Sequence, residues 1–372
     1  MKAFLAPEPG ARHALVVVFL RGAADGLTLV PPVEDDDSHR ARPTLAVRGR
    51  DALPLDGFFG LHPALGPLQP LFREGVLSIH HAVGSEDDTR SHFAAQDLME
   101  RAGDGAGGGW LARHLRHRRG EPGGPLAAIA IGEALPESLR GAPGATALRS
   151  LEAISFGEQG PAFASALEAL HAPDQGLLGA TARQTLAALR QLDDLARQPA
   201  APAPGADYPD HRFGQGLALL ARLIKARVGL EAATIDLDGW DTHFTQAPLI
   251  VPLMDTLARG IAAFRADLGT DIEHVSVVVM TEFGRRVAEN SAIGTDHGRA
   301  SVFLALGGGI AGGAVRGRWP GLSSSMLEGP GDLAVTTNYR DLLAGVIAPR
   351  WGAEHLSLVF PGFPLRPASF SA

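Results

Sequence analysis

Acidic and imidazole side chains stand next to the ends of several apolar runs in this 372-residue chain. Six of them are candidate ligands of a divalent cation: Asp25, Asp241, His243, Glu282, Asp296 and His297. The chain has no cysteine, so a metal site must use oxygen and imidazole ligands, which suit Zn²⁺, Mn²⁺ or Mg²⁺. One or two such ions would polarise a phosphoryl or related oxyanion centre. The pattern therefore predicts metal-assisted chemistry on an anionic ester.

Ordinary structural roles are open to the same residues. Asp25 precedes Gly26 and fits a turn. His243 is two residues after Asp241, close enough to share one ion in an extended segment, but a histidine there can also cap a helix or be satisfied in the core. Both interpretations stay open at this point.

Glu282 has a stronger need for a partner. It ends an apolar run, where a buried and unpaired carboxylate is costly, so it requires a cation or hydrogen-bond donors. A metal ion meets that need, and Arg285 or Arg286 would meet it equally well.

Two hydroxyl side chains are the candidate nucleophiles. Thr89 and Ser91 follow the apolar run 76–83, and Ser91 precedes a segment, 93–100, with the composition of a helix. A hydroxyl at a helix start lies near free N–H groups and the positive end of the dipole, which suits an alkoxide or a bound anion. The alternative is plain N-capping, since the chain has neither a G-x-S-x-G elbow nor a G-K-[ST] phosphate loop.

The apolar runs predict the strands that position these side chains, at 14–20, 76–83, 232–237, 275–280 and 302–306. Apolar residues at helical spacing in 217–228 and 253–268 predict helices directly before two of the strands. Alternating strands and helices predict an α/β fold with right-handed crossovers and a parallel sheet covered on both faces. Ligands of such sheets bind beyond the carboxyl ends of the strands, where the candidates lie.

Composition excludes several classes of protein. The chain is 45% hydrophobic, and its 41 acidic and 33 basic residues give a net charge of −8, so disorder and a nucleic-acid partner are both disfavoured. The longest strongly apolar run, 14–20, is about a third of a membrane span, so none is predicted. The sequence as written predicts a cytoplasmic protein, or a periplasmic one if an export signal was removed.

The chain 1–372 is predicted to form one domain with two interruptions. The segment 101–125 is rich in Gly, Arg and His, and 198–212 contains an Ala/Pro run, so both are expected to be loops or linkers. The basic run 113–119 is expected to be a solvated helix face, with an anion-binding lid as the alternative. The oligomeric state is left open.

Five motifs in order carry a family resemblance. They are Leu20–Leu27, Ser91–Asp97, Gly239–His243, Thr281–Arg285 and Gly294–Gly298, and together they resemble the bacterial domain-of-unknown-function family 1501. That family is grouped with the alkaline phosphatase and sulfatase superfamily. The resemblance implies a three-layer αβα sandwich with a mostly parallel central sheet, a two-metal site and a hydroxyl nucleophile at a helix start.

The resemblance also implies roles for single residues, assigned by order along the chain. Metal ligands would be Asp25, Asp241 with His243, Glu282 and His297, with Asp296 adjacent, and the nucleophile would be Ser91 or Thr89. The superfamily commonly has an Asp-His pair where this chain has Glu282-Phe283, so one imidazole is missing and a second metal loses a ligand. The Pro and Arg of a formylglycine sulfatase motif are absent after Ser91.

These observations predict a metal-dependent hydrolase or transferase of phosphate, phosphonate or sulfate esters. The nucleophile would be a hydroxyl or a metal-activated water, and Arg21 or Arg285 would hold the non-bridging oxygens of a small anionic substrate. The alternative function is that of a non-catalytic or single-metal relative that binds a carbohydrate or a partner protein.

Overall fold

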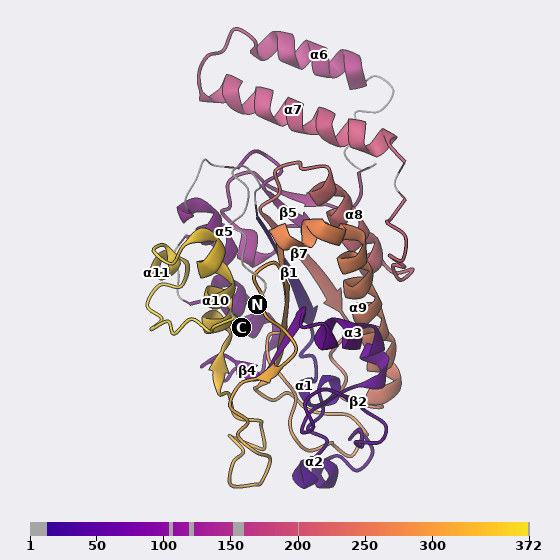
Figure 1. The fold of residues 1–372 in the computed structure, drawn as a ribbon. Coiled ribbons are helices and arrows are strands. Elements are labelled where there is room, and N and C mark those ends of the chain that lie inside the picture. The colour runs from indigo at the N-terminus through magenta and orange to yellow at the C-terminus, as the bar shows by residue number, and fades with distance from the viewer. Residues whose placement is uncertain (1–12, 104–106, 119–122, 152–159, 200, 371–372) are drawn as a thin grey trace.

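The centre of the molecule is a nine-stranded sheet (Figure 1). The computed structural model describes residues 13–103, 107–118, 123–151, 160–199 and 201–370. The strands run in the order β10-β4-β9-β8-β1-β7-β5-β6, with β11 paired to β4. Their bounds are β1 Ala14–Arg21, β4 Leu77–Gly84, β5 Ala128–Ile131, β6 Ala145–Leu148, β7 Ala232–Asp238, β8 Val275–Met280, β9 Ser301–Gly307, β10 Val315–Arg316 and β11 Thr337–Asn338.

The five strands predicted from apolar runs are confirmed as β1, β4, β7, β8 and β9. Most neighbours pair in parallel, including β1 with both β7 and β8. The exception is β9, which is antiparallel to β4 and to β8. Because β9 runs in the opposite direction, its amino end lies at the same edge as the carboxyl ends of β4 and β8.

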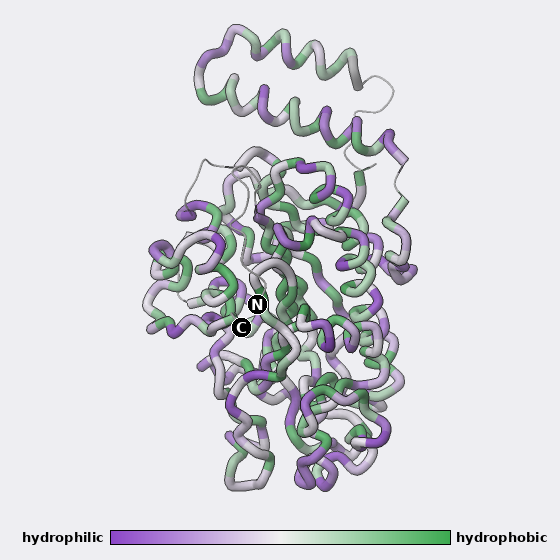
Figure 2. The backbone as a smooth tube through the Cα atoms, viewed as in Figure 1, coloured by the Kyte–Doolittle hydropathy of each residue, from purple (hydrophilic) through white to green (hydrophobic). Residues whose placement is uncertain are grey.

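Side-chain alternation along β1 divides the core into two layers. Val16 and Val18 belong to the apolar cluster on one face, whereas Leu15 and Val17 belong to the cluster on the other, as the two-residue period of a strand requires. Figure 2 shows the apolar residues concentrated in these central strands. Each face therefore needs its own cover of helices.

Helices cover both faces, which gives the predicted three-layer αβα architecture (Figure 1). One layer contains η1 Pro63–Leu68, α3 Gln69–Arg73, α8 Arg212–Lys225 and α9 Gln246–Leu268. The other contains α4 His92–Arg101, α5 Trp110–His117, α10 Tyr339–Trp351 and α11 Leu356–Val359. Shorter elements are α1 Gly26–Leu29, α2 Asp36–Ala41, β2 Leu53–Pro54, β3 Gly60–Leu61, η2 Glu137–Leu139 and η4 Gly269–His274.

Helix α9 and η4 together are long and apolar enough to cross a membrane by length and composition, with a mean hydropathy of 1.3 over the best window. Met254, Leu257, Ile261 and Phe264 of α9 are buried in the core cluster shared with the sheet. This burial is the arrangement of a core helix in an αβα sandwich.

A helical hairpin stands apart from the sandwich (Figure 1). It consists of α6 Gly160–His171 and α7 Leu177–Arg197. Leu192 and Leu195 near the end of α7 are buried with the core, whereas Leu177 and Leu178 at its start are exposed. The hairpin is thus attached to the sandwich through its base.

The two predicted interruptions differ in structure. The described residues of 198–211 form no helix or strand, as expected of a linker, and residue 200 lies outside the described part. The segment 101–125 is not only a loop, because it contains α5, while 104–106 and 119–122 lie outside the described residues. The expected solvated face is wrong for Arg113 and His114, which are buried. Arg113 instead donates to the carbonyl oxygens of Gly108, Arg101 and Val359.

Gly22 lies where β1 meets the segment that follows β7. Its φ is +113°, which L-residues rarely adopt, and a Cβ placed there would lie 2.6 Å from the backbone nitrogen of Asp241. The turn after β1 therefore requires glycine for two reasons, its dihedral angle and the close approach of a neighbouring backbone.

Backbone strain at one position costs about 1–3 kcal/mol. We expect Gly22→Ala to lower the free energy of unfolding by more than this, because the steric overlap with Asp241 adds to the strain. Gly57→Ala is the matched control, since Gly57 has φ +95° with no atom within 4 Å of its Cβ position. Urea unfolding of both variants measures the difference. Equal losses would contradict a steric role for the Asp241 backbone.

Candidate metal centre

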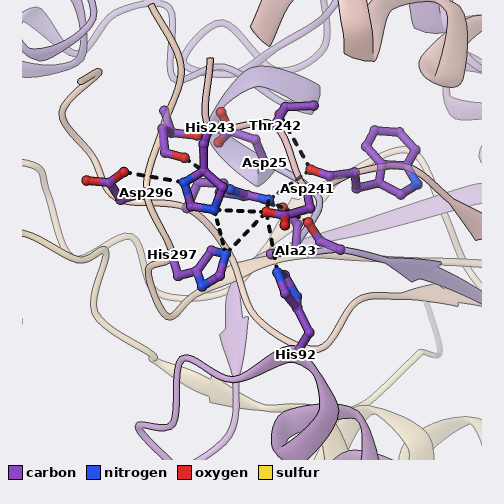
Figure 3. Close-up of polar contacts among 12 residues, drawn as sticks. Ala23, Asp25, His92, Asp241, Thr242, His243, Asp296 and His297 are labelled. Atoms are coloured by element: carbon purple, nitrogen blue, oxygen red, sulfur yellow. Dashed lines mark hydrogen bonds and ion pairs between the residues drawn. The ribbon is translucent and has the colours of Figure 1, made fainter. Parts of the chain in front are cut away.

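Four side chains converge at the sheet edge formed by the carboxyl ends of β4, β7 and β8 and the amino end of β9 (Figure 3). Asp241 and His243 follow β7, and His297 precedes β9. His92 is the first residue of α4, which follows β4. The antiparallel direction of β9 is the reason that His297, although it precedes its strand, reaches the same edge as residues that follow theirs.

The Oδ1 atom of Asp241 lies at the centre of this group. It is 3.0 Å from Nε2 of His243, 3.2 Å from Nε2 of His297 and 3.4 Å from Nε2 of His92. Nε2 of His243 and Nε2 of His297 are 2.9 Å apart. Ligand atoms of His92, Asp241 and His297 all lie within 4.8 Å of one another, as a shared cation requires.

The Nδ1 atom of each histidine faces an acceptor outside the group. Nδ1 of His92 is 2.9 Å from Oε1 of Glu282, and Nδ1 of His297 is 2.8 Å from the carbonyl oxygen of Arg90. Nδ1 of His243 is 3.4 Å from Oδ1 of Asp296. Because a carbonyl or carboxylate oxygen only accepts, each Nδ1 is placed to donate a proton to its partner. The neutral imidazole that carries its proton on Nδ1 has a free Nε2 lone pair, which is the form that binds a metal ion, whereas the other tautomer donates from Nε2 to Oδ1 of Asp241.

This donor set fits a divalent cation. A carboxylate oxygen and imidazole nitrogens are ligands that Zn²⁺ takes in proteins, and Oδ1 of Asp241 also accepts from Arg285 at 2.8 Å. The contacts of 2.9–3.4 Å match the separation of about 3.3 Å between neighbouring ligands of a tetrahedral ion bound at about 2.0–2.1 Å. Nε2 of His92 is also buried without a hydrogen-bond partner among the described residues. The Nδ1 contacts to carboxylate or carbonyl oxygen are those that orient metal-binding histidines.

The site is open to solvent on one side. The side chains of Asp241 and His243 are 46% and 41% exposed, whereas those of His92 and His297 are 21% and 18% exposed. With His92, Asp241 and His297 as its three protein ligands, a tetrahedral ion here would keep one position for a water molecule or a substrate, which is the arrangement of catalytic rather than structural zinc sites.

The electrostatics of the group follow from its contacts. Burial would raise the pKa of Asp241, but hydrogen bonds from Arg285 and His297 outweigh it and lower the pKa to about 2. The hydrogen bond to Glu282 raises the pKa of His92, whereas burial lowers the pKa of His297. Asp241 is therefore a carboxylate at neutral pH, as a metal ligand must be.

Glu282, predicted as a ligand, has a different set of contacts. Its carboxylate accepts hydrogen bonds from the backbone of Gly22, from Gln96 and from Thr281, and it faces Nδ1 of His92. Burial would raise the pKa of Glu282, but its hydrogen bonds lower the pKa below the ordinary value. The hydrogen bond with His92 has the largest effect among them. Neither Arg285 nor Arg286 is its described partner. Glu282 thus contacts a ligand rather than the point where the ligands meet.

Asp25, also predicted as a ligand, has its countercharge within the protein. Oδ2 of Asp25 is 2.6 Å from Nη1 of Arg42 and accepts hydrogen bonds from Thr28 and Gln246. The carboxyl group is buried, which would raise its pKa, and Arg42 lowers it below the ordinary value. Arg42 supplies the positive charge that the sequence analysis assigned to a metal ion.

The two arginines predicted to hold substrate oxygens are engaged in protein contacts. Arg21 lies 2.6 Å from Asp236 and 2.7 Å from Glu100. Arg285 is 1% exposed and donates to the backbone carbonyls of Gly22, Ala23, Trp240 and Thr295 and to Oδ1 of Asp241. Arg285 is therefore a positioning residue for Asp241, since its side chain does not reach solvent.

The candidate nucleophiles lie at the start of α4, next to His92. Oγ of Ser91 accepts from the backbone nitrogen of Ala94 at 3.5 Å, which is the N-cap contact. Oγ1 of Thr89 accepts from the backbone nitrogen of Ser91 at 3.3 Å. Among the described residues neither hydroxyl has a hydrogen bond to an imidazole or a carboxylate. The structure thus supports the capping role and leaves the nucleophile role a prediction.

Sequence reasoning missed His92 as a candidate ligand. It follows the predicted strand 76–83 at the start of the predicted helix, and a single histidine between Ser91 and Phe93 gives no spacing signal. What identifies it is its contact with Glu282, a residue 190 positions away.

Comparison with known proteins identifies a family. A family model described as "Protein of unknown function (DUF1501)" matches residues 75–355, well over half of the chain. None of the curated protein sequences matches this chain.

Three solved structures are similar to the chain, each at 10% identity. A 2-O GAG sulfatase gives a TM-score of 0.36, covering 97% of this chain and 73% of that one. The C-terminal periplasmic domain of EptC from Escherichia coli, in complex with Zn, gives 0.32, covering 81% and 74%. The phosphonate monoester hydrolase of Agrobacterium radiobacter gives 0.37, covering 96% and 79%. Likeness at this level is no evidence of a shared activity.

We expect Asp241→Ala to weaken Zn²⁺ binding by more than 100-fold, because Oδ1 of Asp241 faces Nε2 of all three histidines. Removal of a residue that only orients a ligand costs roughly 10- to 100-fold. Asp238→Ala is the control: it removes a carboxylate three positions earlier that is paired with Arg212. Equilibrium dialysis against Zn²⁺ compares the two. Equal binding by both variants would exclude Asp241 as a ligand.

Proposed function

The chain belongs to the DUF1501 family of proteins of unknown function, and we propose that it is a metal-dependent hydrolase of phosphate, phosphonate or sulfate esters. The observation that supports this proposal is the convergence of three Nε2 atoms on one carboxylate oxygen at an open edge of the sheet. Transfer to an acceptor other than water would use the same site. The substrate is a small anionic ester.

The proposed ligands are Asp241, His297 and His92, whose ligand atoms lie within 4.8 Å of one another, and His243 lies beside them with its Nε2 3.0 Å from Oδ1 of Asp241. Asp25 and Glu282 have partners within the protein and are not assigned to a second ion. A divalent ion in this position would act as a Lewis acid on an ester oxygen and supply several kcal/mol of charge stabilisation.

The remaining residues of the site hold these ligands in place. Glu282 and Asp296 fix the orientation of His92 and His243 through their Nδ1 atoms, and the carbonyl oxygen of Arg90 does the same for His297. Arg285 holds the Asp241 carboxylate from the buried side and leaves the exposed side free for substrate. Asp296 is half exposed beside His243 and can accept a proton from an attacking water.

Hydrolysis of aryl phosphate, phosphonate and sulfate esters tests the proposal. We expect turnover by the metal-loaded protein, loss on chelation, and recovery with Zn²⁺, Mn²⁺ or Mg²⁺. Asp241→Ala should lower kcat by about 10³-fold or more, which corresponds to several kcal/mol of lost transition-state stabilisation. Asp238→Ala should retain activity. No turnover with any of the three metals would refute the function.

Ser91→Ala distinguishes a hydroxyl nucleophile from water. Because Oγ of Ser91 caps α4 and contacts no base among the described residues, we expect kcat to fall by less than about tenfold. We expect a loss of about 0.5–2 kcal/mol in the free energy of unfolding, as for other serine N-caps. Asp97→Ala, which removes an exposed carboxylate of α4 that is paired with Arg101, serves as the control. A loss of kcat as large as that of Asp241→Ala would instead identify Ser91 as the nucleophile.

A further inference from the structure

A second cavity lies along α4, beyond the metal centre. Its volume is about 600 Å³, which is within the range of small-molecule sites. The loop after β4, including Glu86, forms one wall, Leu98 and Met99 of α4 form another, and Arg340 and Phe363 close it. None of these residues takes part in the proposed chemistry.

Arg340 is a buried cation with a fixed plane. Only 5% of the residue is exposed. Its guanidinium carbon is 5.0 Å from the ring centre of Tyr339 and 4.8 Å from that of Phe363. Two aromatic rings restrict the orientation of the guanidinium and compensate part of its desolvation.

The hydrogen-bonding capacity of Arg340 is only partly used. Its described hydrogen bonds to a carboxylate both come from Nη1, which donates to Oε1 and Oε2 of Glu86 at 2.6 and 2.7 Å. Nε of Arg340 is buried and has no hydrogen-bond partner among the described residues. A planar guanidinium binds carboxylate, sulfate or phosphate best through two parallel N–H groups, so Arg340 has donors left for an anion.

Glu86 already occupies part of an anion site. Its carboxylate accepts from Nδ2 of Asn338 at 2.9 Å as well as from Arg340, so it lies at the amino end of the 13-residue helix α10. Helix amino ends attract negative charge. The side chain of Glu86 is 61% exposed and belongs to a loop, so a ligand anion can compete with it at little cost.

We propose that this cavity binds a second anionic group of the substrate, a carboxylate, sulfate or phosphate, through Arg340, and that Glu86 competes for the same site. The inference rests on the proposed function for the identity of the bound molecule. The proposed substrate would then carry two anionic groups, one that binds at the candidate metal centre and one that binds at Arg340.

The cavity adjoins the surroundings of the candidate metal centre. Ser85, Asp87 and Leu98 line the cavity and also a hollow of about 10 Å³, which is room for one water molecule, and Glu282 and Thr89 line that hollow too. Leu98 follows the ligand His92 by six residues on α4, which is about 9 Å along the helix.

The first experiment measures binding of inorganic sulfate to the full chain by calorimetry. We expect Glu86→Gln to bind sulfate at least fivefold more tightly than the parent, because the competing charge is removed. Arg340→Lys keeps the charge but loses the fork, and should bind at least tenfold more weakly. Asp207→Asn, which removes an exposed carboxylate paired with Arg259, is the control and should change nothing.

Anomalous scattering from selenate in crystals of Glu86→Gln locates the anion. Selenate at Arg340 supports the proposal. Selenate found only at the metal centre, or a sulfate affinity that Glu86→Gln leaves unchanged, overturns it. Glu86 is exposed, so this variant remains decisive if Arg340→Lys fails to fold.

Kinetics then test whether the anion belongs to the substrate. The two probes are an aryl ester with one anionic group and the same ester with an added carboxylate on its aryl group. Glu86→Gln should lower KM at least threefold for the second ester only, with kcat unchanged. Sulfate binding at Arg340 without this difference in KM overturns the assignment to substrate. Absence of all turnover refutes the proposed function, while the sulfate titration still decides whether the cavity binds anions.

Discussion

The buried guanidinium of Arg285 joins four segments that lie far apart in the chain. It follows β8, and it donates to carbonyls after β1, to Trp240 and Asp241 after β7, and to Thr295 before β9. Each of those segments would otherwise bury polar backbone atoms without partners, at a cost of about 1–3 kcal/mol apiece. One arginine satisfies them together and thereby connects the loops of the candidate metal centre. Asp241 then presents its carboxylate to the three histidines.

The direction of one strand decides which residues can meet there. In a wholly parallel sheet, the residues before a strand and those after it lie at opposite edges. β9 is antiparallel to both of its neighbours, so Asp296 and His297 lie beside Asp241 and His243. The bond between His243 and Asp296 and the contact between the two histidines follow from this reversal.

Buried carboxylates in this molecule are stabilised in two ways. Asp25 and Glu282 are both almost fully buried, and each has its partners within the protein: Arg42, Thr28 and Gln246 for Asp25, and His92, Gln96 and two further donors for Glu282. Asp241 differs because it is half exposed and faces three Nε2 atoms as well as Arg285. The proposed cation is therefore placed at Asp241 and not at the other two. At the second cavity, Glu86 is also paired with an arginine, Arg340, but its carboxylate is exposed and a ligand anion would compete with it.

The sequence by itself determined the αβα architecture and its five main strands, because apolar runs and helical periodicity reflect local burial that each segment carries alone. It also placed Asp241, His243, Asp296 and His297 near one edge, because residues that flank strands of a sheet must lie at its ends. Only the tertiary structure decided that His92 lies beside them, that Asp25 pairs with Arg42, and that Arg285 donates to Asp241 from within the protein. These assignments depend on pairings between residues up to about 260 positions apart, and neither spacing nor composition records which distant donor a buried acceptor meets.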